Sequence, residues 1–196
     1  MRSSAVMKAR RIAVFCVALL VACLVRQGSL SAAEGRASAP GEYVVKTALV
    51  YNFIKFVEWP PEPAVRVKTI RLCVLDSERV PVLFSDLDGQ EIMGKRLAVS
   101  SVQDAREAGD CDILFLTAAQ SPRLPAVLDV IAGHPTLTIG DTAGYARQGI
   151  MINMYLENKR VRFEINVERA RSAGLRISTK LLNLAGKVYG AVQAGE

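Results

Sequence analysis

Few residues in this chain have types and spacings that suggest catalysis. The only histidine, His134, precedes Pro135 in a predicted connection, so the several histidines that zinc sites commonly use are missing. Gly-x-Ser-x-Gly, P-loop and Gly-x-Gly-x-x-Gly motifs are also missing. Asp110 and Asp112 flank Cys111, but paired acids at the start of a strand are usually solvated turn residues. The sequence therefore predicts no catalytic residues, no metal and no cofactor.

The cysteines have more definite chemistry. Cys16 and Cys23 lie in the N-terminal segment, which leaves Cys73 and Cys111 as an even pair in the body of the chain. In an oxidising compartment such a pair indicates a disulfide. The two residues belong to predicted strands that are neighbours in a flavodoxin-like order. A bridge would close a loop of about 38 residues, for which the chain-entropy model gives roughly 4 kcal/mol. A catalytic redox pair is the alternative, but no Cys-x-x-Cys is present.

A polar loop at residues 140–145 is a candidate ligand site. It follows a predicted strand, and ligands of open α/β sheets bind beyond the carboxyl ends of strands. Two glycines would let the backbone approach a ligand, and Asp141 and Thr142 would supply polar groups. The alternative is that Asp141 or Thr142 caps a helix. No specific ligand is indicated.

Aromatic residues near the start of the body are candidates for a partner interface. A helix over about 42–57 has an apolar face with the 3.6-residue period, formed by Val45, Ala48, Leu49, Asn52, Phe53 and Phe56. Phe53 and Phe56 therefore read as core residues. Tyr51 and Trp59 lie off this face or at its end, so we expect them at the interface.

The N-terminal segment predicts export. Basic residues precede the apolar run 12–25, which has the length of a signal-peptide core, and Ser31-Ala32-Ala33 offers small residues for cleavage after Ala33. A lipoprotein signal ending at Cys23 is the alternative, and the protein would then be held at the membrane by lipid. An uncleaved anchor is a third reading. We expect a signal peptide at 1–33, a flexible lead-in at 34–41 and one domain at 42–190.

Removal of residues 1–33 changes the charge of the protein. The chain has 25 basic and 19 acidic residues, and the segment holds five of the basic ones and no acid. The mature chain then has 20 basic and 19 acidic residues, a net charge of about +1. No basic surface remains that would suggest nucleic-acid binding.

Strands and helices alternate between the lead-in and residue 140. Such alternation predicts a parallel α/β core, in a single Rossmann-like domain with a mixed sheet. The expected strands are 69–75, 97–101, 112–116 and 136–139. The expected helical pieces are 80–87, 104–108 and 122–132.

Residues 150–167 predict a β-hairpin at the C-terminal end of this core. Apolar and polar residues alternate strictly on both sides of Asn158-Lys159, which suits a two-residue turn; Asn tolerates the positive φ of tight hairpin turns and Lys suits it less, so no turn type is assigned. The predicted cross-strand pairs are Leu156–Val161, Met154–Phe163, Ile152–Ile165 and Ile150–Val167, with Glu157 opposite Arg160. After a short apolar piece, Ser178 is expected to cap a helix with Leu181, Leu184, Ala185 and Val188 on one face.

Two segments resemble the YfiR-like family. The first is Tyr51–Pro60, and the second comprises Arg160–Asn166, Ala173–Ser178 and Leu181-Leu182. The resemblance covers roughly residues 42–188. It implies a small periplasmic α/β protein with a cysteine pair at places matching Cys73 and Cys111. Some relatives have a second pair, for which this chain has no cysteines, so redox behaviour attached to that pair is not carried over.

The resemblance also implies a function. The best understood family member represses an inner-membrane diguanylate cyclase by binding its periplasmic sensor region. We therefore expect a non-enzymatic periplasmic regulator that binds such a sensor and lowers cyclic-di-GMP signalling and biofilm formation. A periplasmic small-ligand-binding protein serving another sensor, such as a histidine kinase, is the main alternative. A periplasmic enzyme of unrecognised chemistry is a third, and homodimerisation stays open.

Overall fold

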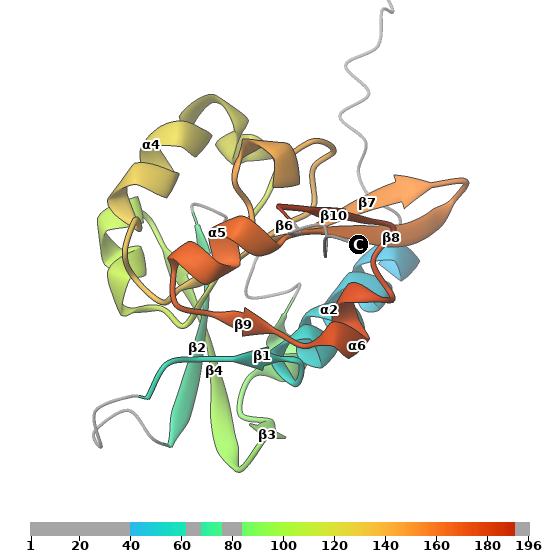
Figure 1. The fold of residues 1–196 in the computed structure, drawn as a ribbon. Helices are drawn as coiled ribbons and strands as arrows, with labels where there is room; N and C mark the ends of the chain where they lie inside the picture. Colours follow the sequence, from blue (N-terminus) through green and yellow to red (C-terminus); the bar gives the residue numbers. More distant parts are fainter. Residues whose placement is uncertain (1–39, 62–67, 76–83, 191–196) are drawn as a thin grey trace, which may run out of the picture. The chain divides into compact units, whose positions relative to one another are not determined.

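The computed structural model describes residues 40–61, 68–75 and 84–190. The predicted signal peptide, most of the lead-in and the first half of the helix expected at 80–87 lie outside these residues. Eight strands form one mixed sheet in the order β10-β8-β7-β6-β5-β2-β4-β3, and β1 and β9 form a second sheet (Figure 1). The strands are β1 Val57–Glu58, β2 Thr69–Leu75, β3 Glu91–Ile92, β4 Lys95–Val102, β5 Ile113–Leu116, β6 Leu137–Gly140, β7 Ile152–Glu157, β8 Arg160–Asn166, β9 Arg176–Ile177 and β10 Lys187–Tyr189.

Helices and 3-10 turns connect these strands. The α-helices are α2 Pro40–Ile54, α4 Leu124–Val130, α5 Val167–Ser172 and α6 Thr179–Leu182. The 3-10 helices are η2 Ser85–Leu87, η3 Ala105–Asp110, η4 Ala118–Arg123 and η5 Ala146–Gln148. The helix expected at 122–132 is thus a shorter α-helix preceded by a 3-10 segment. Pro125 suits the observed start of α4, because a residue in the first helical turn has no intrahelical partner for the N–H that proline lacks.

The centre of the large sheet is parallel, as predicted. β4, β2, β5 and β6 are neighbours in that order, and all three pairings are parallel. The first of these strands in the chain therefore lies between the second and the third, which is the flavodoxin-like arrangement. The prediction of an α/β fold with a mixed sheet is confirmed.

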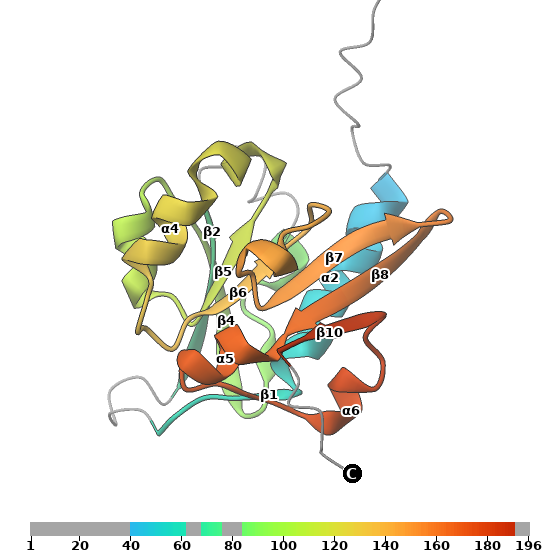
Figure 2. The ribbon, with the colours of Figure 1, turned by 45° about the horizontal axis from the view of Figure 1, so that its top comes forward.

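Two hydrophobic cores cover the two faces of the central strands. In β2, Leu72 and Val74 belong to one core, and Cys73 and Leu75 belong to the other. Because successive side chains of a strand point to opposite faces, a strand buried on both sides is apolar throughout. α2 and α5 contribute to the first core and α4 to the second (Figure 2).

The hairpin has the predicted register over its regular part. The pairs Leu156–Val161, Met154–Phe163, Ile152–Ile165 and Glu157–Arg160 are all present in the antiparallel ladder of β7 and β8. Asn158 and Lys159 both have positive φ, of 50° and 62°, which is the pattern of a type I′ turn.

The predicted outermost pair of the hairpin, Ile150–Val167, is absent. Val167 begins α5, because the side chain of Asn166 accepts a hydrogen bond from the Arg169 N–H and caps that helix. Ile150 precedes β7 and lies in the second core. Capping chemistry therefore ends the ladder one pair early.

Helix α2 differs from its prediction in two ways. It ends at Ile54, because Val57 and Glu58 pair with Ile177 and Arg176 of β9. Its buried face is also rotated by about one residue from the expected one. Lys46, Val50, Phe53 and Ile54 are buried, and Val45, Ala48 and Asn52 are exposed. The expected face excluded Lys46, which the structure buries in ion pairs with Glu42 and Asp141.

The C-terminal helix is also shorter than predicted. Ser178 caps α6 as expected, but the helix ends at Leu182 and Leu184 is exposed. Val188 instead lies in β10, in parallel register with Ile165. The Gly186 N–H donates to the Phe163 carbonyl at 2.8 Å. A side chain at Gly186 would meet the Tyr155 hydroxyl, so glycine permits this approach.

Candidate partner interface

The structure places both predicted interface residues around β3 and the turn that follows it. Tyr51 lies on α2, half buried, and its hydroxyl donates to the Glu91 carbonyl of β3 at 3.4 Å. The Lys55 ammonium lies 4.2 Å from the centre of the Tyr51 ring. The Lys55 ammonium therefore lies over the Tyr51 ring, and β3 holds the Tyr51 hydroxyl.

Trp59 lies just after β1 and lines a pocket of about 390 Å³, which we call the Trp59 pocket. The indole Nε1 is buried and has no hydrogen-bond partner among the described residues. A buried N–H without an acceptor costs free energy, and an acceptor from a partner would reach this one only after the indole moves. An interface role for Trp59 stays a prediction.

The walls of the Trp59 pocket are mostly apolar and its rim is charged. Met93, in the turn between β3 and β4, is 63% exposed. Apolar centres with polar rims are typical of protein interfaces, and tryptophan is enriched among the residues that dominate their binding energy. The lining residues are Val57, Glu58, Trp59, Pro60, Pro61, Ile70, Met93, Lys95 and Asp112.

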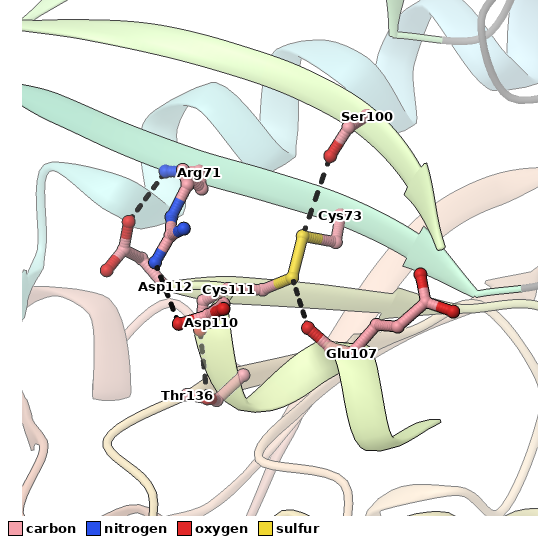
Figure 3. A network of polar contacts seen from close by, with 8 residues as sticks. All are labelled: Arg71, Cys73, Ser100, Glu107, Asp110, Cys111, Asp112 and Thr136. Carbon is pink, nitrogen blue, oxygen red and sulfur yellow. Dashed lines mark hydrogen bonds and ion pairs between the residues drawn. A yellow bond between two sulfur atoms is a disulfide. The ribbon is translucent and has the colours of Figure 1, made fainter. Parts of the chain in front are cut away.

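The predicted disulfide between Cys73 and Cys111 is present (Figure 3). It joins β2 to the end of η3, with a Cα–Cα distance of 5.9 Å, and both cysteines are buried. Beside it, the Asp112 carboxylate accepts the Arg71 N–H at 2.6 Å and Thr136 donates to the Cys111 carbonyl at 2.9 Å. The bridge is enclosed by structural contacts, which favours a stabilising role.

The acids beside this disulfide have structural contacts of their own. The exposed Asp110 forms an ion pair with Arg71 at 3.7 Å, and the buried Asp112 caps the Arg71 backbone. No group of three or more potential metal ligands occurs among the described residues. His134 is exposed.

Lys46, which no sequence pattern singled out, contacts the candidate ligand loop. Lys46 Nζ contacts Asp141 Oδ2 at 3.0 Å and Glu42 Oε1 at 2.7 Å. Thr142 donates to the other Asp141 oxygen at 3.4 Å. The spacing of Glu42 and Lys46, one helical turn apart, is the sequence signal that could have suggested the first pair. A ligand role for Asp141 and Thr142 stays a prediction.

Lys46 is buried between the carboxylates of Glu42 and Asp141. Its side chain is only 3% exposed. Burial by itself would lower the pKa of Lys46, but the hydrogen bonds and charges of Glu42 and Asp141 outweigh it and raise the pKa above its ordinary value. The lysine therefore stays charged inside the protein.

A second buried polar chain was also missed from the sequence. The Asn153 amide donates to Glu164 Oε1 at 3.0 Å, and the Tyr189 hydroxyl donates to Glu164 Oε2 at 2.9 Å. Arg147 Nε in turn donates to the Tyr189 hydroxyl at 3.4 Å. These bonds tie β7, β8 and β10 together. The predicted hairpin register already places Asn153 opposite Glu164, but no local pattern predicts that Tyr189 of β10 reaches the same carboxylate.

Comparisons with known proteins assign this α/β protein to a family. The sequence profile of the YfiR/HmsC-like family matches residues 43–186. The chain belongs to the YfiR/HmsC-like family, as its two motif segments predicted. Membership suggests a periplasmic regulator. No helix in the described part of the chain combines the length and apolar character that membrane crossing requires.

Solved structures show a similar fold. A conserved domain protein from Vibrio cholerae O1 biovar El Tor matches with a TM-score of 0.52 at 11% identity. The match covers 76% of this chain and 60% of that protein. An ABC domain from Streptococcus pneumonia, solved in complex with L-Trp, matches at a TM-score of 0.48 and 12% identity, over 70% of this chain and 58% of that domain. At 11% identity the first match shows a shared fold and nothing about function. The second match is too distant in structure to add to this.

Proposed function

We propose that this protein is a periplasmic regulator that binds the periplasmic region of an inner-membrane diguanylate cyclase and represses it. The family match over residues 43–186 carries this proposal. The Cys73–Cys111 disulfide supports it, because such bridges persist in oxidising compartments. Binding would favour the inactive state of the sensor through a higher affinity for that state.

Tyr51 and Trp59 are the proposed contact residues. Both adjoin the turn that exposes Met93, so a partner could cover the three side chains together. Burial of one large aromatic residue in a partner commonly dominates the energy of an interface. The unpartnered Trp59 N–H would then gain an acceptor from the sensor.

Gene deletion and complementation test the proposed function. Deletion should raise cellular cyclic-di-GMP and surface attachment, and a full-length exported copy should reverse both. A copy lacking residues 2–33 should not, because its partner surface would remain in the cytoplasm. Unchanged cyclic-di-GMP in the deletion strain, while the wild type makes the protein, would favour a ligand-binding protein for another sensor such as a histidine kinase.

A further inference from the structure

A second, separate surface lies at the other end of α2. The start of α2 lies near the outer end of the β7–β8 hairpin (Figure 2). The two elements border a groove of about 660 Å³, which we call the α2–hairpin groove. Its lining residues are Gly41, Glu42, Val45, Leu156, Lys159, Arg160 and Val161.

The apolar face of the hairpin is packed against α2 near Phe163 and is left partly open near the turn. Phe53 of α2 packs against Phe163 with ring centres 5.0 Å apart. The next pair toward the turn, Leu156–Val161, lies beside the first turn of α2, and Leu156 is 50% exposed. Val45 across the groove is 46% exposed. Large apolar side chains gathered on a surface mark an interaction site.

The charge of the groove is positive. Lys159 and Arg160 line it, and neither has an ionic partner among the described residues. The acid of the groove, Glu42, is already held by Lys46 at 2.7 Å. An occupant therefore meets two free cations beside an apolar floor.

Two simple occupants fit this surface poorly. The lead-in at residues 34–39 reads Glu-Gly-Arg-Ala-Ser-Ala and has no large apolar side chain to place against Leu156. A second copy related by a two-fold axis would bring its own Lys159 and Arg160 to the same contact. Like charges placed together across an interface oppose association.

We infer that the α2–hairpin groove binds an acidic amphipathic helix of the membrane sensor, with apolar side chains against Leu156 and Val45 and carboxylates beside Lys159 and Arg160. Helix-in-groove recognition uses this combination of apolar anchors and complementary charge. The inference rests on the proposed function and adds a second contact to it. α2 has fifteen residues. At a rise of 1.5 Å per residue, the groove and the Trp59 pocket are separated by about 22 Å along the helix.

In vivo photo-crosslinking tests the occupant directly. A benzophenone amino acid replaces Leu156 in the full-length exported protein, and the same substitution at Leu184, an exposed residue of another surface, is the matched control. We expect Leu156 to crosslink to a periplasmic acidic helix of a membrane sensor, mapped by mass spectrometry, and Leu184 not to do so. Crosslinks to a second copy or to lipid only, or equal crosslinking at both positions, would overturn the inference.

Charge and apolar substitutions test the same contact by function. Leu156→Glu and Arg160→Glu should raise cyclic-di-GMP to the level of the deletion strain. Leu184→Glu and Arg171→Glu, at exposed positions outside both surfaces, should retain wild-type levels. Circular dichroism of each purified variant verifies folding. Full repression by both folded groove variants would overturn the inference and leave the proposed function intact.

The two claims fail separately. If deletion leaves cyclic-di-GMP unchanged, the proposed cyclase function fails. The crosslink at Leu156 then still decides the groove, because an acidic helix of a different sensor would uphold it. Loss of binding to phosphatidylglycerol vesicles in Leu156→Glu, without any protein crosslink in the cell, would assign the groove to a membrane surface and overturn the inference.

Discussion

At the scale of single residues, two side chains have arrangements that differ from ordinary surface residues. Trp59 has a buried N–H with no acceptor among the described residues, and Lys46 has a buried positive charge between two carboxylates. The first is a cost that a partner can remove. The second is a cost that the fold has already offset. Substitution of Trp59 should therefore affect mainly binding, and substitution of Lys46 should affect mainly the stability of the fold.

Trp59→Phe should impair repression without unfolding the protein. The substitution keeps an aromatic ring in the pocket and removes an N–H that bonds to nothing in the described structure. We expect the free energy of unfolding to change by less than about 1.5 kcal/mol, since no intramolecular hydrogen bond is lost. Urea unfolding and cellular cyclic-di-GMP measure the two effects. Wild-type repression by this variant would argue against an acceptor on the sensor.

Lys46→Met should destabilise the protein strongly, because it leaves Glu42 and Asp141 without their shared cation. Loss of one partner of a buried ion pair typically costs about 3–5 kcal/mol. The pKa of Lys46 is raised above 10.5, so its stabilising effect is complete below that pH and is lost as pH rises through the folded value. Urea unfolding at pH 7 should show the full difference from wild type, and measurements above pH 10.5 a smaller one.

Lys180→Met is the control for this comparison, because Lys180 is exposed. It should unfold like the wild type at both pH values. A difference between wild type and Lys46→Met that grows with rising pH would contradict the assignment of a raised pKa.

At the scale of elements, sequence patterns predicted those structures that depend on residues close together in the chain. The hairpin register followed from alternation on both sides of Asn158-Lys159, where a slip of one residue would expose every apolar side chain. The pairing of β1 with β9 and of β10 with β8 could not be predicted in this way. β1, β9 and β10 have only two or three residues each, and the partner of each is not its neighbour in the chain.

The candidate site shows the same division between local and distant information. The positions of Tyr51 and Trp59 off the apolar face were visible from the helical period. The Lys46–Asp141 contact was not, because the burial of a lysine depends on an acid 95 residues later. The exposed Leu156 was also missed, since alternation places it on the buried face and only the start of α2 leaves it uncovered.

The disulfide should contribute a large share of the stability of the elements it joins. The two cysteines are 38 residues apart, and Cys73→Ala should lower the free energy of unfolding by about 2–5 kcal/mol. Chemical denaturation of the variant measures this loss. Mass spectrometry of unreduced peptides from the exported protein should show Cys73 linked to Cys111, and free thiols at both would contradict the bridge.

The hairpin turn offers a stabilising substitution. Lys159 has a φ of 62°, a region that costs most side chains about 1 kcal/mol and glycine almost nothing. Lys159→Gly should therefore raise the free energy of unfolding by about 1 kcal/mol. Lys180→Gly, inside α6, should lower it instead. Thermal unfolding of both variants gives the comparison, and a lower melting temperature for Lys159→Gly would exclude the type I′ turn.

At the scale of the whole molecule, the predicted signal peptide would place the proposed partner surfaces in the periplasm. Its basic, apolar and small-residue order predicts cleavage after Ala33. Protein recovered from the periplasm should therefore begin at Glu34 and carry no lipid. N-terminal sequencing and intact mass provide the check. A lipidated chain beginning at Cys23 would replace this prediction with a membrane-tethered regulator.

The pairing of Val57 with Ile177 has a consequence for biogenesis. A polypeptide is synthesised from its N-terminus, and an exported chain also crosses the membrane in that order. β1 therefore cannot pair with β9 until nearly all of the chain is present. Contacts between distant segments also form slowly, because a long loop must close first. The Trp59 pocket is therefore a late product of folding. Nascent or C-terminally truncated chains would not display it, so only finished molecules would compete for the sensor.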